Sequence, residues 1–169
     1  MNAEHMPEIV RVLREIDENP RYKVDLSILD ELQNCVADGR AYKSMTAAAF
    51  KSQDDLQVVA RRLDEAQWLR SRVREIKCKH MWALSALQRL WDVCCTVLYR
   101  DDEYRKVTPA PARDAKVNAA LPRLRERFDN VKMICKMADE ADVTLSGAYY
   151  TMRELVRINT AYLDAQGEE

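Results

Sequence analysis

Apolar residues recur at steps of three and four along most of this chain, which is the spacing of one face of an α-helix. The longest run covers residues 52–98 and contains no Gly or Pro. Its seam is formed by Leu56, Val59, Leu63, Ala66, Arg70, Val73, Lys77, His80, Leu84, Leu87, Trp91, Cys94 and Leu98. A continuous helix of ~45 residues is roughly 65–70 Å long. The pattern therefore predicts a long antiparallel bundle or a coiled-coil-like assembly.

Two shorter runs precede this segment. The first covers residues 6–18 and should end at Asn19-Pro20, because a residue before proline avoids the helical conformation. The second covers residues 26–42, with Asp25 as its N-cap. Gly39 costs a helix roughly 1 kcal/mol relative to Ala, so the helix can break or bend near Asp38-Gly39. The alanine-rich residues 46–50 can continue the helix.

The C-terminal half begins with a predicted loop over residues 100–111. Thr108 is a natural N-cap, with Pro109 at the first helical position. The following helix is expected over residues 109–141, and Pro122 should kink or split it. A last helix either begins at Asp142 or continues from the one before.

Together these segments predict an all-α fold, a bundle of four to five helices with one very long central helix in a hairpin-like core. We expect residues 1–20 to form an acidic arm or short helix, and residues 21–169 to form a single helical domain. The sequence contains no internal repeat and no low-complexity tract.

Composition supports this interpretation and narrows the function. The chain has 169 residues, 47% hydrophobic and 33% charged, with only three glycines. Because tight turns and phosphate-binding loops need glycine, its scarcity argues against sheets, hairpins and nucleotide loops. There is no apolar run of the ~18 residues that a membrane span needs and no secretory signal. With five cysteines, an odd number, we expect free thiols in a reducing cytoplasm.

Net charge is −1, but the charges are unevenly distributed. Residues 1–20 carry five acidic and two basic side chains. A group of cations that we call the basic cluster follows far along the chain: Arg70, Arg72, Arg74, Lys77 and Lys79. Two of its members and His80 occupy seam positions that should be apolar. The cluster is therefore either a solvated helix face or a candidate site for nucleic-acid phosphates.

Aromatic residues lie near the basic cluster. Trp68, Trp82 and Tyr99 are close to it along the same helical segment. Such rings can stack on unpaired bases. Each tryptophan taken alone is nevertheless expected in the core, because a large apolar side chain gains most from burial.

No pattern in the chain is typical of catalysis or metal binding. The possible metal ligands are Cys78, His80 and the vicinal Cys94-Cys95 pair, and neighbouring residues on a helix point about 100° apart. The remaining histidine, His5, lies near the terminus, and no Ser-His-acid spacing is recognisable. We expect a protein without enzymatic activity, metal or cofactor.

The order of segments also suggests a family. The basic helix is followed by an acidic, tyrosine-containing connector at residues 99–104 and a charged segment at residues 113–118. An apolar helical pair around residues 133–137 and 145–149 ends the pattern. Over residues 24–160 this layout resembles the phage recombination-mediator proteins of the UvsY type. The resemblance implies a homo-oligomeric ring that binds single-stranded DNA and helps a recombinase to displace single-strand-binding protein in the host cytoplasm, with the basic cluster contacting DNA.

Two hypotheses follow. In the first, the basic cluster neutralises phosphates, and repetition around an oligomer multiplies the weak binding of each subunit. Charge reversal at Arg70 and Arg74 would then abolish DNA binding and leave helicity intact. In the second, the chain is an oligomeric helical adaptor or scaffold, for example a phage structural or inhibitory protein. The cluster would then meet an acidic partner or the chain's own residues 1–20.

Overall fold

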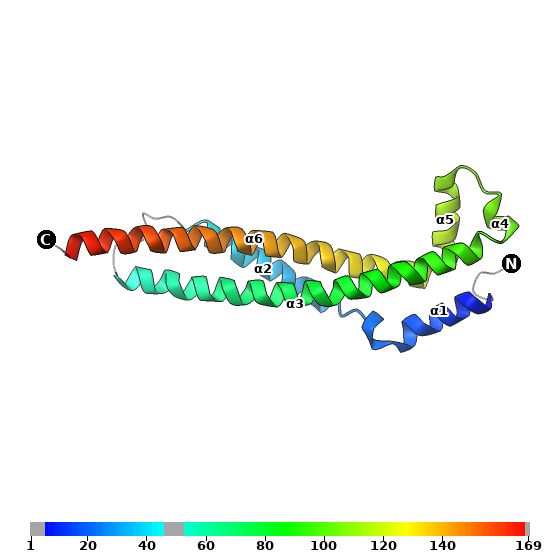
Figure 1. Cartoon of the computed structure of the whole chain (residues 1–169), viewed down its shortest axis with the longest axis horizontal. Helices are drawn as coiled ribbons and strands as arrows, with labels where there is room; N and C mark the ends of the chain where they lie inside the picture. The colour runs from blue at the N-terminus through cyan, green and yellow to red at the C-terminus, as the bar shows by residue number, and fades with distance from the viewer. Residues whose placement is uncertain (1–5, 46–52, 168–169) are drawn as a thin grey trace. The chain divides into compact units, whose positions relative to one another are not determined.

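The computed structural model describes residues 6–45 and 53–167, and all regular secondary structure within them is helical (Figure 1). In chain order the elements are α1 (Pro7–Glu18), the single 3₁₀ turn η2 (Pro20–Tyr22), α2 (Ser27–Lys43), α3 (Gln53–Leu98), α4 (Asp102–Arg105), α5 (Ala110–Ala120) and α6 (Pro122–Gly167). The all-α class is confirmed. The described residues form six α-helices, and two of them, not one, are 46 residues long.

The two long helices pack against each other as an antiparallel pair (Figure 1). Two ion pairs show their direction, because Arg74 on α3 contacts Asp142 on α6 and Lys77 contacts Asp139. The residue number rises by three along one helix and falls by three along the other. The two helices therefore run in opposite directions at this contact.

Most predicted boundaries in the N-terminal half are confirmed. Helix α1 ends at Glu18, before Asn19-Pro20, and α3 is continuous to Leu98. Helix α2 runs through Gly39 without a break. The predicted helical extension over residues 46–50, and the start of the long helix at residue 52, lie outside the described residues.

The C-terminal half settles two predicted alternatives and corrects one detail. Pro122 splits the predicted helix, since α5 ends at Ala120, but α6 then continues without a break past Asp142. Thr108 is not the N-cap of α5: Pro109 takes this position and the helix begins at Ala110. The second proline of the segment, Pro111, then lies in the first turn, where a missing N–H costs no helical hydrogen bond.

The chain divides into two compact units, and both long helices contribute to each of them. The first unit comprises Met1–Leu26 and Lys79–Cys135, and the second comprises Ser27–Cys78 and Lys136–Glu169. Helix α1 is part of the first unit's core, because Ile9, Val12 and Ile16 are buried among residues of α3, α5 and α6. The second unit has a smaller cluster formed by Tyr42, Val59, Ala66, Ala148 and Met152.

Gly39 has a packing role in the second unit. A Cβ atom added there would lie 3.0 Å from Cγ2 of Thr144 and 3.3 Å from the backbone nitrogen of Leu145 on α6. Gly147, by contrast, faces open space, with only Lys43 Nζ at 4.0 Å. The absence of a side chain at Gly39 therefore lets α2 approach the α6 backbone closely, which explains a glycine inside a helix.

We expect Gly39→Ala to lower the free energy of unfolding by about 1 kcal/mol, because the clash with α6 outweighs the gain in helix propensity. Gly147→Ala is the matched control and should raise it by up to ~1 kcal/mol. Urea denaturation followed by circular dichroism measures both changes. Two stabilised variants would show that α2 does not pack on α6 at this point.

Candidate functional site

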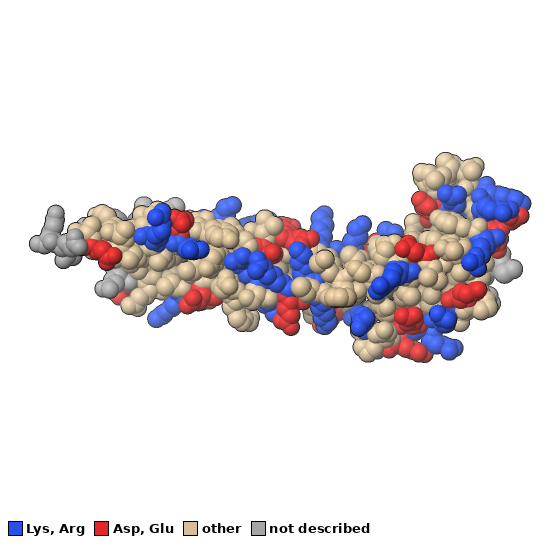
Figure 2. Space-filling model, in the orientation of Figure 1, with Lys and Arg blue, Asp and Glu red and all other residues tan. Residues whose placement is uncertain are grey.

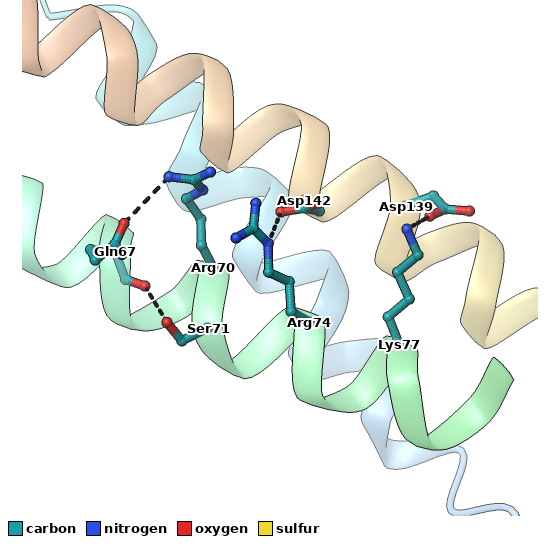
Figure 3. A network of polar contacts seen from close by, with 7 residues as sticks. All are labelled: Gln67, Arg70, Ser71, Arg74, Lys77, Asp139 and Asp142. Carbon is teal, nitrogen blue, oxygen red and sulfur yellow. Dashed lines mark hydrogen bonds and ion pairs between the residues drawn. The ribbon is translucent and has the colours of Figure 1, made fainter. Parts of the chain in front are cut away.

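The basic cluster occupies the part of α3 that belongs mainly to the second unit, and three of its members point toward α6 (Figure 3). Arg70 is the most enclosed of them, with 9% of its surface exposed. Its guanidinium lies 5.0 Å from the centroid of the Tyr149 ring and 5.9 Å from that of Tyr150, and Nη1 donates to Oε1 of Gln67 at 3.3 Å. Arg70 is therefore packed against aromatic faces in the helix interface, as its seam position indicates.

The other two inward cations are neutralised by acids of α6. Arg74 Nε donates to Oδ1 of Asp142 at 3.1 Å, and Lys77 Nζ lies 2.6 Å from Oδ1 of Asp139 (Figure 3). The hydrogen bond with Asp139 raises the pKa of Lys77 above its usual value, with a smaller contribution from the charge of Asp142. Both positive charges are thus already matched within the chain, which reduces their attraction for phosphate.

The last two members of the basic cluster do not face α6. Arg72 pairs with Glu31 of α2 at 2.8 Å and with Glu75 one turn along α3 at 3.1 Å. The hydrogen bond with Glu31, and to a smaller extent that with Glu75, raises the pKa of Arg72 above its usual value. Lys79 is exposed and belongs to the first unit. The structure therefore divides the five predicted residues among three different surroundings.

The expected burial of the tryptophans is wrong for two of them. Trp68 in the second unit is 67% exposed, and Trp82 in the first unit is 74% exposed. Only Trp91 lies at the edge of a core. The signal was present in the sequence, because residues 68 and 82 fall between the seam positions 66, 70, 80 and 84, on the opposite side of the helix.

Exposed apolar side chains also lie along α6, and the sequence pattern did not predict their exposure. Val143, Tyr150 and Ile158 lie on α6 in the second unit and are 72%, 57% and 52% exposed. Their spacing of seven and eight residues places them along one side of the helix, away from the buried Leu145 and Met152. We call these three residues the α6 stripe. The spacing of these three residues is visible in the sequence, but it does not distinguish an exposed face from the buried face of the same helix.

Charges of both signs are mixed on the surface that Figure 2 shows. On that face, acidic and basic side chains lie among one another in each unit. The second unit also contains exposed ion pairs, such as Arg40 with Glu140 and Arg62 with Glu65. A mixed surface of this kind favours neither long phosphate backbones nor acidic membranes.

Two neighbouring thiols on α3 are poorly suited to react. Burial raises the pKa of Cys94 to about 11 and, with help from Asp92 and Asp114, raises the pKa of Cys95, so both thiols stay protonated near neutral pH. In residues 6–45 and 53–167, no group of three or more His, Cys, Asp or Glu side chains could hold a metal ion. No helix of this part is long and apolar enough to cross a membrane.

Comparison with known proteins gives no relative. No protein-family model matches the chain, and neither a curated protein nor a solved structure is significantly similar to it. The function must therefore be argued from the residues themselves.

Proposed function

We propose that this chain is a non-enzymatic assembly protein, an oligomeric helical scaffold whose copies associate through the α6 stripe. The observation that carries this proposal is the row of exposed apolar side chains formed by Val143, Tyr150 and Ile158. A second seam at near-heptad spacing, on a helix that already buries its first seam, is typical of helices that pack on two sides.

Charge supports a second copy as the partner. At a net charge of −1, two copies repel each other weakly, and low net charge promotes association. Arg74 and Lys77 are already paired with acids of α6. For the second unit, apolar contact is therefore a stronger interaction than attraction to phosphate. Tyr150 adds a large ring of the kind that concentrates binding energy in interfaces.

A second candidate, the single-stranded-DNA-binding mediator that assists recombinase loading, is favoured by the exposed tryptophans. Trp68 lies beside Arg72 at a shallow hollow that Ser71 and Glu75 also line. Trp82 follows the exposed Lys79 by one turn of α3. An indole can stack on an unpaired base, while a neighbouring cation attracts the phosphate of that nucleotide. In this version Arg72 and Lys79, rather than Arg70, Arg74 and Lys77, contact the strand.

One sedimentation-velocity experiment tests both candidates. The protein is run with a fluorescein-labelled single-stranded oligonucleotide, so that absorbance reports assembly and fluorescence reports DNA. We expect the wild type to sediment as an oligomer, and Val143→Lys with Ile158→Lys to reduce it to a monomer without loss of helicity. Val58→Lys, at an apolar position of α3 that is 49% exposed, is the control and should remain oligomeric.

The outcomes separate the two candidates. A monomeric wild type, or an oligomer that the stripe variant leaves intact, would refute assembly through the α6 stripe. Label that moves with the protein at low salt and dissociates at high salt would support the DNA-binding candidate. Label that stays free at low salt would exclude it.

A further inference from the structure

A hollow in the first unit combines aromatic walls with unused polar groups. It has a volume of about 340 Å³ and lies where α3, α5 and α6 meet. Trp91 and Tyr99 line it from the α3 side, Asp114 and Asn118 from α5, and Arg125 from α6. Its volume is at the lower end of the range for small-molecule pockets. We call it the α5 hollow.

Two arginines lie against the aromatic rings of the hollow, and they differ in whether they form an ion pair. The Arg125 guanidinium lies 5.8 Å from the Trp91 ring centroid and is paired with Asp129 at 2.8 Å. The Arg113 guanidinium lies 5.0 Å from the Tyr99 ring centroid, and no ion pair of Arg113 occurs among the described residues. Its Nε is buried without a hydrogen-bond partner in that part of the chain. Arg113 does not line the hollow, but its guanidinium lies over Tyr99, which does, and no ion pair within the described residues offsets its charge.

The polar edge of the hollow comes from one face of α5. Asp114 and Asn118 are four residues apart, so their side chains are neighbours on the helix. The carboxylate of Asp114 accepts one hydrogen bond, from the Tyr99 hydroxyl at 3.3 Å. Because a carboxylate has about four acceptor sites, most of its capacity remains. The Asn118 amide adds both a donor and an acceptor.

We propose that the α5 hollow binds a purine nucleotide, with guanine as the base. A guanine ring presents two neighbouring N–H donors, which match the two oxygens of Asp114, and its carbonyl can accept from the Asn118 amide. Its flat face stacks on the wall formed by Trp91 and Arg125. The phosphate is attracted by the charge of Arg113, which has no acidic partner among the described residues. This goes beyond assembly, because it uses neither the α6 stripe nor a second copy.

Fluorescence of Trp91 tests the proposal in the full chain. Trp68→Phe with Trp82→Phe leaves Trp91 as the single reporter, and both replaced side chains are exposed. Titration with guanosine monophosphate should quench Trp91 saturably, and uridine monophosphate, which has one ring N–H donor and no amine, should bind at least ~10-fold more weakly. Asp114→Asn should weaken guanosine monophosphate binding by ~10-fold or more. Glu126→Gln, at an exposed acid of α6, should leave binding unchanged.

Three results of the nucleotide titrations would overturn the proposal. These are no quenching at millimolar guanosine monophosphate, equal binding of the two nucleotides, or unchanged binding by Asp114→Asn. Saturable quenching by free indole as strong as that by guanosine monophosphate would also refute it, because the hollow would then accept any flat ring, including a partner's aromatic side chain. Thermal unfolding of each variant confirms that the compared proteins are folded.

Discussion

Arg70→Glu is expected to lower the free energy of unfolding by about 3 kcal/mol, the scale for an uncompensated buried charge. At 9% exposure the new carboxylate would lose most of its hydration. It would also replace a cation that lies over the Tyr149 ring, whose negative face repels an anion. The Gln67 carbonyl that now accepts from Arg70 would lose its donor. All three changes disfavour the folded state.

Urea denaturation of three variants measures this effect. Arg70→Met keeps the length and apolar contact of the side chain, so we expect it to stay within ~1 kcal/mol of the wild type. Arg74→Glu replaces an exposed partner of Asp142 and should cost ~1 kcal/mol or less. Equal losses for Arg70→Glu and Arg74→Glu would mean that Arg70 is not buried in the interface.

The Arg70 prediction changes how a binding experiment must be designed. The sequence alone suggests that charge reversal at Arg70 and Arg74 removes DNA binding and spares helicity. With Arg70 buried, loss of binding in that double variant would report damage to the fold as well as lost phosphate contacts. Exposed Lys79 and half-exposed Arg72 are better positions for such a test.

Periodicity predicted the fold well because burial in a helix is a local property. The steps of three and four correctly place Val59 and Leu87 in the interior, and they also place Arg70 and His80 there. From the sequence, the seam cation Arg70 suggested an external partner, whereas the structure shows aromatic rings of α6 against its guanidinium. Its partners are on α6, and the register of α6 on α3 is set by the distant helix–helix contacts, which no local pattern contains.

The candidate surfaces were only partly predictable for the same reason. The α6 stripe could be read from the spacing of Val143, Tyr150 and Ile158, but the sequence does not say which of two apolar faces stays exposed. The α5 hollow could not be predicted, because it depends on the split at Pro122, after which α5 and α6 run in different directions (Figure 1). Only then do Asp114 and Trp91, which are far apart in sequence, line one space.

Ile16→Ala is expected to lower the free energy of unfolding by ~2–4 kcal/mol, the cost of a cavity in a packed core. Ile16 is fully buried, and α1 gives the first unit two further buried residues, Ile9 and Val12. Val10→Ala, on the exposed side of the same helix, should change stability by less than ~0.5 kcal/mol. Chemical denaturation of both variants gives the comparison, and equal effects would show that α1 is not docked.

If α1 is docked, the acidic N-terminal segment is held by apolar contacts and not by charge alone. An arm held only by charge would depend on exposed ion pairs such as that between Asp17 and Arg123, which stabilise little and weaken with salt. The apolar contacts of Ile16 do not weaken with salt in this way. The difference between Ile16→Ala and Val10→Ala should therefore persist at 1 M salt. Removal of residues 1–20 would then open the core of the first unit, so it cannot serve as a test of charge shielding alone.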